Sequence, residues 1–485
     1  MLVGNKKGIM VYCIVITLLI LIIIFVGFTV PSKAQLPNGF HLADSKLDIQ
    51  EVATQIDRPT SFAFLGPDDL LILEQYKGTV LRIKNGTKLA PPLLDVNVGN
   101  SSERGMLGIS IIPNLNGNSS VFLYYTEAES RDGGPILGNR LYRYTFVDDP
   151  NGGKLVDRTL LLDLPGLPNL PGNPGQDHNG GKIAIGPDGN IYLTIGDVRR
   201  KTVTQNLANG GEVDGSGGIL RVRPNGHAIG EGIIGTTHPA NKYFAYGIRN
   251  SFGIDFDPIT GYLWNTENGP SINDEINLVT PGFNSGWQTI TGFAKNDSQT
   301  WPPLTQEELL SQAAIHLAYA VHEMVSLNAS GAEAELQVAR GQLEEVLDKS
   351  KLLYDFEGKG EYSDPEFVWN QTVAPTAIQF FNSQKYGNEY LNKMFVAEYQ
   401  TGKLLCFSLD VNRTELKLGN ELSDQIANSW DETNSVAFGK GFDGITDIKV
   451  GPDGFLYITE RNSGTLSRII PQLTGHNDTK SFACS

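Results

Sequence analysis

Residues 182–197 read KIAIGPDGNIYLTIGD, and this stretch decides the fold. An alternating apolar segment leads into a Gly-Pro-Asp-Gly turn, and a second apolar segment then ends in an acid. Such a pattern is typical of a β-hairpin. The same theme occurs at five other places, residues 61–74, 107–127, 253–269, 377–402 and 447–464.

These six hairpin repeats, mostly about 70 residues apart, indicate a repetitive all-β fold. We predict a six-bladed β-propeller over residues 45–485, because radial repetition leaves only short, protected sheet edges. An open β-solenoid would need shorter and more regular repeats. In a propeller the loops between strands gather at one end of the central channel, so residues far apart in sequence can form one site.

The interval between the fourth and fifth repeats is longer than the others and has helical character. Thr305 and Glu308 form a capping-box pattern, as do Ser330 and Glu333, and apolar residues follow each pair at helical spacing. We predict a helical hairpin at residues 305–350, inserted within the propeller and packed on itself and the adjacent blade. A lid or a partner-docking element is the alternative.

The first 34 residues resemble a targeting segment. Lys6 and Lys7 precede an apolar run, Gly8 to Val30, that is long enough to span a bilayer. Ser32-Lys33-Ala34 resembles a signal-peptide cleavage site. Residues 1–34 are therefore predicted to be a transmembrane anchor or a cleaved signal peptide. Either one places the rest of the chain outside the cytoplasm, anchored at the cell surface or secreted.

Charge and sequons agree with an extracytoplasmic protein. The net charge of −16 argues against nucleic acid as a partner. Eight N-x-S/T sequons suggest a glycoprotein, although some are expected by chance. They begin at Asn85, Asn100, Asn118, Asn296, Asn328, Asn370, Asn412 and Asn477.

Three cysteines occur, and Cys13 lies in the apolar segment. Cys406 and Cys484 are able to pair in an oxidising compartment and fix the C-terminus. Two unpaired thiols are an equal alternative.

Polar residues cluster between Tyr246 and Trp287, in YGIRNSFGIDFDPITGYLWNTENGPSINDEINLVTPGFNSGW. A cation and an amide, Arg249 and Asn250, precede two predicted strands, and an Asn-Gly-Pro segment and an acidic pair follow them. Gly, Asn and Asp are also ordinary turn formers. An arginine and two acids are not needed for turns, so we interpret this stretch as a ligand site on a rigid β scaffold.

A second candidate group surrounds the third repeat. His178, in QDHNGG, precedes the first strand of that hairpin, and Asp197 follows the second. Because a hairpin returns its chain to the starting edge, the two side chains can be neighbours. A neutral imidazole oriented by a carboxylate is suited to general-base catalysis.

Several motifs together resemble the soluble quinoprotein glucose dehydrogenase family, the glucose/sorbosone dehydrogenases. They are DHNGGKIAIGPDGNIYLTIGD, GSGGILRVRPNG and YGIRNSFG with ENGPSINDEINLV and GFNSGW, together with RPTSFAFLGPDDLLILEQYKG and SSERGMLGISIIPN. The resemblance runs from about Pro59 to Ile470, with the predicted helical segment as an interruption.

The resemblance implies a six-bladed propeller that binds pyrroloquinoline quinone (PQQ) and Ca²⁺. It places His178 on the base that takes the proton of the C1 hydroxyl of an aldose as hydride passes to the quinone. Asp197 then orients this base. The residues assigned to the quinone are Arg249, Asn250 and Asn268, and carbonyl oxygens of Gly269 and Pro270 are assigned to the calcium.

The chain departs from this family pattern at three positions. Gln400, Gly444 and Thr446 stand where the family has cations from the fifth and sixth blades. We therefore expect calcium to be retained and the tricarboxylate quinone to bind weakly, unless other cations replace these. The candidate replacements are Arg199, Arg200, Lys201 and Lys403.

Three functional hypotheses follow. The first is a quinoprotein-type sugar dehydrogenase with a small-molecule aldose substrate and an external electron acceptor, held at the membrane if residues 1–34 stay uncleaved. The second is a calcium-binding propeller that has lost the quinone and serves as an interaction module. The third, a lactone- or ester-hydrolysing propeller, is disfavoured by Arg249-Asn250.

Overall fold

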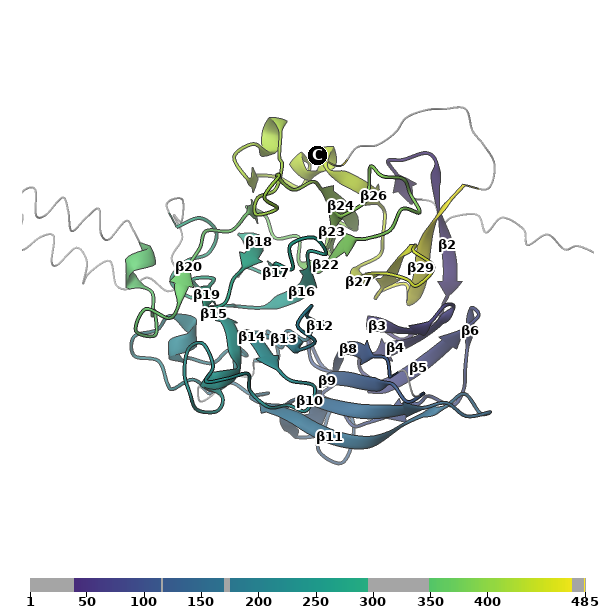
Figure 1. Ribbon diagram of the computed structural model, residues 1–485, viewed down its shortest axis with the longest axis horizontal. Helices are drawn as coiled ribbons and strands as arrows, with labels where there is room; N and C mark the ends of the chain where they lie inside the picture. The colour runs from purple at the N-terminus through teal and green to yellow at the C-terminus, as the bar shows by residue number, and fades with distance from the viewer. Residues whose placement is uncertain (1–38, 115–116, 170–174, 295–348, 473–483, 485) are drawn as a thin grey trace, which may run out of the picture. The chain divides into compact units, whose positions relative to one another are not determined.

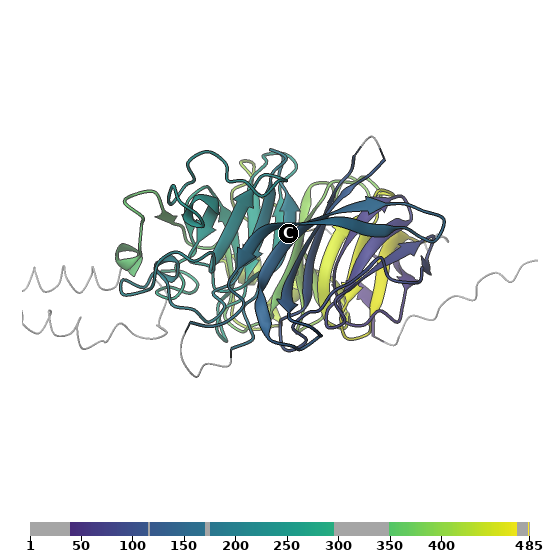
Figure 2. The same ribbon diagram turned by 90° about the horizontal axis from the view of Figure 1, so that it is seen from below.

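The computed structural model describes residues 39–114, 117–169, 175–294, 349–472 and 484. The strands lie in one compact unit, His41–Ser485, and form six separate sheets. Figure 1 looks down the ring of sheets, and Figure 2 shows the same unit from the side. The predicted segment 1–34 and nearly all of the predicted helical segment 305–350 lie outside the described residues, so both stay predictions.

Each sheet begins with an innermost strand that faces the centre of the ring. These are β3 (Pro59–Gly66), β8 (Met106–Ile112), β12 (Ile183–Ile185), β16 (Ser251–Phe256), β22 (Pro375–Phe381) and β27 (Ile445–Val450). Each innermost strand lies against those of its two neighbours, and β27 contacts β3, so the ring is closed. The prediction of an all-β propeller is confirmed.

The second strand of each sheet pairs antiparallel with the first. These strands are β4 (Asp69–Glu74), β9 (Ser120–Ala128), β13 (Ile191–Ile195), β17 (Leu263–Glu267), β23 (Lys393–Glu398) and β28 (Leu456–Glu460). All six predicted hairpins are therefore present, and each is the inner pair of one sheet.

A third strand continues each sheet outward. These strands are β5 (Thr79–Lys84), β10 (Ile136–Val147), β14 (Gly218–Val222), β18 (Asp274–Val279), β24 (Lys403–Phe407) and β29 (Thr465–Pro471). The outer positions are taken by β6 (Thr87–Lys88), β7 (Leu94–Asp95), β11 (Lys154–Leu164), β15 (Tyr243–Tyr246), β21 (Phe367–Trp369) and β26 (Ala437–Lys440). Short strands extend three sheets, namely β1 (His41–Leu42), β19 (Phe283–Asn284), β20 (Glu361–Tyr362) and β25 (Ile426–Ala427).

The sheet that contains the C-terminal strands is completed from the other end of the chain. Its outer strand is β2 (Leu47–Ala53), which pairs antiparallel with β29. The register places Leu47 opposite Pro471. The first and last parts of the propeller are thus joined in one sheet.

The turns of the third and sixth hairpins show why the repeats fold alike. In the third, a carboxylate oxygen of Asp188 accepts the hydroxyl of Tyr192 at 3.1 Å. In the sixth, Asp453 accepts the hydroxyl of Tyr457 at 2.9 Å. The glycine after each aspartate has a positive φ, which is the reason for the Asp-Gly sequence at this turn.

Apolar side chains fill the spaces between adjacent sheets. Between the second and third sheets, for example, Phe122 and Tyr124 of β9 pack with Leu193 of β13 and Leu220 of β14, and all four are fully buried. The alternation seen in the sequence therefore reflects burial between sheets rather than at one central core.

Among the described residues the helical elements are short 3₁₀ helices. They are η1 (Val203–Gln205), η2 (Ala240–Lys242), η3 (Lys349–Leu352), η4 (Asn420–Leu422) and η5 (Glu432–Ser435). Within this part of the chain no helix has the length and apolar character needed to cross a membrane.

Cys406 and Cys484 form a disulfide between β24 and the C-terminal end of the chain. This settles the two alternatives left by the sequence in favour of pairing. A structural disulfide indicates an oxidising, extracytoplasmic compartment.

Candidate functional site

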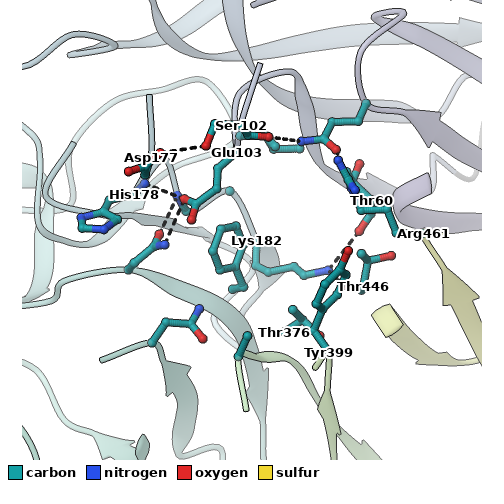
Figure 3. A pocket seen from close by; sticks show the side chains of 18 of the residues that line it. Thr60, Ser102, Glu103, Asp177, His178, Lys182, Thr376, Tyr399, Thr446 and Arg461 are labelled. Carbon is teal, nitrogen blue, oxygen red and sulfur yellow. Dashed lines mark hydrogen bonds between the residues drawn. The ribbon is translucent and has the colours of Figure 1, made fainter. Parts of the chain in front are cut away.

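A cavity of about 640 Å³ opens at the centre of the ring (Figure 3). Residues at or next to the start of all six innermost strands line it, namely Thr60, Leu107, Lys182, Phe252, Thr376 and Thr446. The loops before these strands supply most of the remaining lining. The cavity therefore collects residues from every sheet, as expected for loops at one end of a propeller.

His178 lines this cavity, and Asp197 lies directly against its imidazole, as the hairpin geometry predicted. His178 Nδ1 is 2.6 Å from Asp197 Oδ1, and both side chains are almost completely buried. Asp197 also accepts the Trp287 indole N–H at 2.8 Å and the Arg199 backbone N–H at 2.8 Å. Burial alone would raise the pKa of Asp197, but His178, the Arg199 backbone N–H and the charge of Arg249 lower it, so the carboxylate is ionised.

The hydrogen bond to Asp197 fixes the tautomer of the imidazole. An ionised carboxylate can only accept, so Nδ1 carries the proton and Nε2 of a neutral ring keeps its lone pair. Among the described residues no hydrogen bond to His178 Nε2 is formed. The imidazole is thus prepared to accept a proton at Nε2.

The backbone at His178 is held in an unusual conformation. Its φ is 61°, in the left-handed region that non-glycine residues rarely adopt. The backbone N–H of His178 donates to Glu103 Oε2 at 2.5 Å, and the same oxygen accepts the side-chain amide of Asn250 at 3.0 Å. At Gly196, a Cβ atom would lie 2.4 Å from the carbonyl oxygen of His178, so only glycine permits this close approach.

Arg249, Asn250 and Asn268 also line the cavity, as predicted from the stretch 246–287. Arg249 Nη1 donates to the Asn268 carbonyl oxygen at 2.8 Å, and the guanidinium lies 5.4 Å from the centroid of the Trp287 ring. Arg249 Nε and Asn268 Oδ1 are buried and have no hydrogen-bond partner among the described residues. Unpartnered buried polar atoms on a cavity wall indicate that a polar ligand completes the site.

Of the two residues assigned to calcium, Gly269 lines the cavity, whereas Pro270 is exposed and does not. The turn is rigid because Gly269 N–H donates to Asp274 Oδ1 at 2.8 Å. The other oxygen of Asp274 accepts the hydroxyl of Thr372 and the backbone N–H groups of Val373 and Ala374. No group of three or more His, Cys, Asp or Glu side chains is placed as a metal site in the described part of the chain.

The family model described as "Glucose / Sorbosone dehydrogenase" matches residues 56–335, more than half of the chain. The chain belongs to the glucose/sorbosone dehydrogenase family. It is 23% identical to the aldose sugar dehydrogenase of Escherichia coli (strain K12), covering 90% of this chain and 96% of the relative. It is 24% identical to quinoprotein glucose dehydrogenase B of Acinetobacter calcoaceticus, with 89% of each covered.

Solved structures of similar proteins agree in fold. The PQQ-bound aldose sugar dehydrogenase of Streptomyces coelicolor aligns with a TM-score of 0.58 and 20% identity, over 89% of this chain and 99% of that one. The resemblance predicted from sequence motifs is confirmed at the level of the family.

In this member of the glucose/sorbosone dehydrogenase family, the three positions that depart from the family pattern lie at or beside the cavity. Gln400 and Thr446 line it. Gly444 has a φ of 72°, and a Cβ there would lie 2.8 Å from the Tyr399 ring and 2.7 Å from Asn462. A side chain at Gly444 would be strained by this φ and would require Tyr399 and Asn462 to move, which disfavours a cation at that position.

Of the four cations proposed as replacements, only Arg199 lines the cavity, and it is paired with Asp177 at 3.0 Å. Arg200 is paired with Asp214 at 2.5 Å, away from the cavity. Lys201 and Lys403 are likewise outside the lining. Of the four candidates left open by the sequence, Arg199 is therefore the one placed at the cavity.

Four charged residues of the cavity were given no role in the sequence prediction, namely Glu103, Asp177, Lys182 and Arg461. Glu103 and Lys182 belong to motifs that carried the family resemblance, SSERGMLG and DHNGGK. The charge of each residue, inside a motif already singled out, was the signal that could have identified Glu103 and Lys182 as site residues. Arg461, in the ERNSG turn after β28, had no such signal.

Proposed function

We propose that this protein is an extracytoplasmic aldose dehydrogenase that uses PQQ and Ca²⁺, with His178 as the general base. The observation that carries the proposal is that His178, oriented by Asp197, lines the same cavity as Arg249 and Asn268, whose side chains carry unpartnered polar atoms. A cavity of about 640 Å³ is within the range of small-molecule and cofactor sites.

The residues present fit the expected groups. Arg249 supplies a buried cation with one free nitrogen, and Asn250 and Asn268 supply amides for a polar planar ligand. The main chain at Gly269 and Pro270 is the proposed source of carbonyl ligands, which suit Ca²⁺. When bound, the quinone supplies a hydride acceptor, and calcium makes it more electrophilic.

The chain itself handles the proton. His178 Nε2 takes the proton from the C1 hydroxyl of the aldose while the hydrogen on C1 leaves as hydride, so the C1 carbon is oxidised to the lactone level. The imidazolium that forms is stabilised by ionised Asp197 through the 2.6 Å hydrogen bond at Nδ1. Trp287 and the backbone of Arg199 keep Asp197 in place. Reoxidation of the cofactor requires an external electron acceptor.

The disulfide between Cys406 and Cys484 supports the extracytoplasmic location. Whether residues 1–34 serve as an anchor or a cleaved signal can be decided by N-terminal sequencing of the protein from its native membrane and soluble fractions.

The test is titration of the purified protein with Ca²⁺ and PQQ, followed by reduction of an artificial electron-accepting dye with a panel of aldoses. We expect calcium-dependent quinone binding and dye reduction by at least one aldose. Calcium binding without any quinone binding would contradict the proposal and support the interaction module instead. Hydrolysis of a lactone or ester without the quinone would support the third hypothesis.

A further inference from the structure

Arg461 presents a fixed guanidinium to the cavity. Its Nε–H donates to Gln75 Oε1 at 2.8 Å, and its guanidinium lies 5.6 Å from the centroid of the Tyr76 ring. Gln75 is itself held, because its amide donates to the Arg104 carbonyl oxygen at 2.9 Å. The backbone N–H of Arg461 donates to the carbonyl oxygen of Gly444 at 2.9 Å. The plane of the guanidinium is therefore set before any ligand arrives.

The two terminal nitrogens of Arg461 are free. Within the described residues they form no hydrogen bond and no ion pair. Two other arginines of the propeller differ, because buried Arg82 bonds to Asp69 and Asp148, and partly buried Arg468 is paired with Asp453 at 2.8 Å. The Nε of Arg461 is held by a hydrogen bond, but no acid pairs with its two terminal nitrogens. A partly buried arginine in this state is suited to bind a carboxylate.

The group of charges next to Arg461 is also positive overall. Lys182 Nζ is 3.0 Å from Asp447 Oδ1, and Lys449 Nζ is 3.4 Å from Asp447 Oδ2. Two ammonium groups therefore share one buried carboxylate, which leaves one net positive charge. Lys182 Nζ also donates to the Thr446 carbonyl oxygen at 2.7 Å. Figure 3 shows Lys182 reaching toward Thr446, with Arg461 on the side of the cavity away from His178.

We propose that Arg461 is the carboxylate-binding residue of this cavity, with the Lys182–Asp447–Lys449 group adding a long-range positive potential. The ligand class is a planar polycarboxylate, and its identification as PQQ rests on the proposed function. Lys182 acts through its charge, because its ammonium already donates to Thr446 and Asp447. Arg461 acts by direct bidentate hydrogen bonds from its two terminal nitrogens.

The experiment is isothermal titration of PQQ, in the presence of Ca²⁺, into the wild-type protein and four variants. Two variants, Arg461→Ala and Arg461→Gln, remove the guanidinium. A third, Arg461→Lys, keeps the positive charge without the two terminal nitrogens. Arg200→Ala is the control, because Arg200 lies outside the cavity. We expect roughly 10- to 100-fold weaker binding for the first two, as for loss of a charged hydrogen bond. The lysine variant should be intermediate and the control unchanged. Circular dichroism of each variant establishes that it is folded.

Each outcome separates this inference from the proposed function. Wild-type binding with no loss in folded Arg461→Gln overturns the role of Arg461 and leaves the dehydrogenase proposal intact. If the wild type does not bind PQQ, the same titrations are made with benzene-1,3,5-tricarboxylate. Binding of that probe that depends on Arg461 supports a carboxylate site although the quinone proposal fails. No binding of either probe by the wild type overturns the carboxylate site as well.

Discussion

Two walls of the central cavity are built differently. On the His178 wall, the imidazole, Asp197 and Trp287 form a chain of hydrogen bonds between segments that flank strands of one sheet. On the Arg461 wall, a cation with free terminal nitrogens lies beside Gly444, where a side chain would be strained. The difference indicates that proton transfer is determined by the local geometry of His178 and Asp197. Affinity for an anion depends instead on Arg461, a cation from a different turn.

The largest expected effect is on the His178 wall. His178→Ala should lower kcat by about 10²–10⁴-fold, the range for loss of a general base, and leave quinone affinity nearly unchanged. Steady-state dye reduction and isothermal titration measure the two quantities. Unchanged turnover would remove His178 from the mechanism, and lost affinity would show that the two walls are not independent.

Substitution of Glu103 should have a smaller effect on kcat, and it further tests whether the two walls act independently. Glu103→Ala removes the acceptor of the His178 backbone and of the Asn250 amide, so we expect kcat to fall by about tenfold, as for loss of one to two charged hydrogen bonds. Affinity for PQQ should not fall, because a negative charge leaves the cavity. Glu103→Gln keeps an acceptor oxygen and should restore most of kcat. Equal loss of kcat and affinity in both variants would indicate a general structural defect.

The smallest effect concerns pH and the Arg461 wall. Burial lowers the pKa of Lys182 to about 8, an effect that Asp447 partly opposes and Lys449 increases. Lys182 is therefore charged below pH 8 and loses its charge as the pH rises through 8. Affinity for PQQ should be full at pH 7 and fall by at most about tenfold toward pH 9.5. Lys182→Met should bind more weakly at pH 7 and lose this pH dependence in titrations across the range.

The sequence predicted the His178 wall and missed most of the Arg461 wall for a physical reason. His178 and Asp197 lie at the two ends of one hairpin, so local strand pairing brings them together. Arg461 and Gln75 are 386 residues apart, and their contact exists only because the ring of sheets closes. A replacement cation from a different turn leaves no trace in the sequence at the three positions of the fifth and sixth blades where the family has cations.

The fold itself was more predictable than the site. Each hairpin repeat carries its own turn chemistry, such as Asp188 with Tyr192, and this can be read locally. The position of β2 in the fold, by contrast, could not be predicted from its local sequence. Its seven residues match no repeat, and their place is determined by the unpaired edge of β29.

The pairing of β2 with β29 has a consequence for biosynthesis. Leu47 leaves the ribosome early, but its partner Pro471 is made almost at the end of the chain. The closing sheet therefore has the highest contact order in the molecule, and its formation must overcome the loop entropy of nearly the whole propeller. Until synthesis is complete, β2 is a strand without its partner, exposed to proteases and to other unpaired strand edges. We therefore expect the segment of the nascent chain that contains β2 to depend on chaperones for longer than the rest of the propeller.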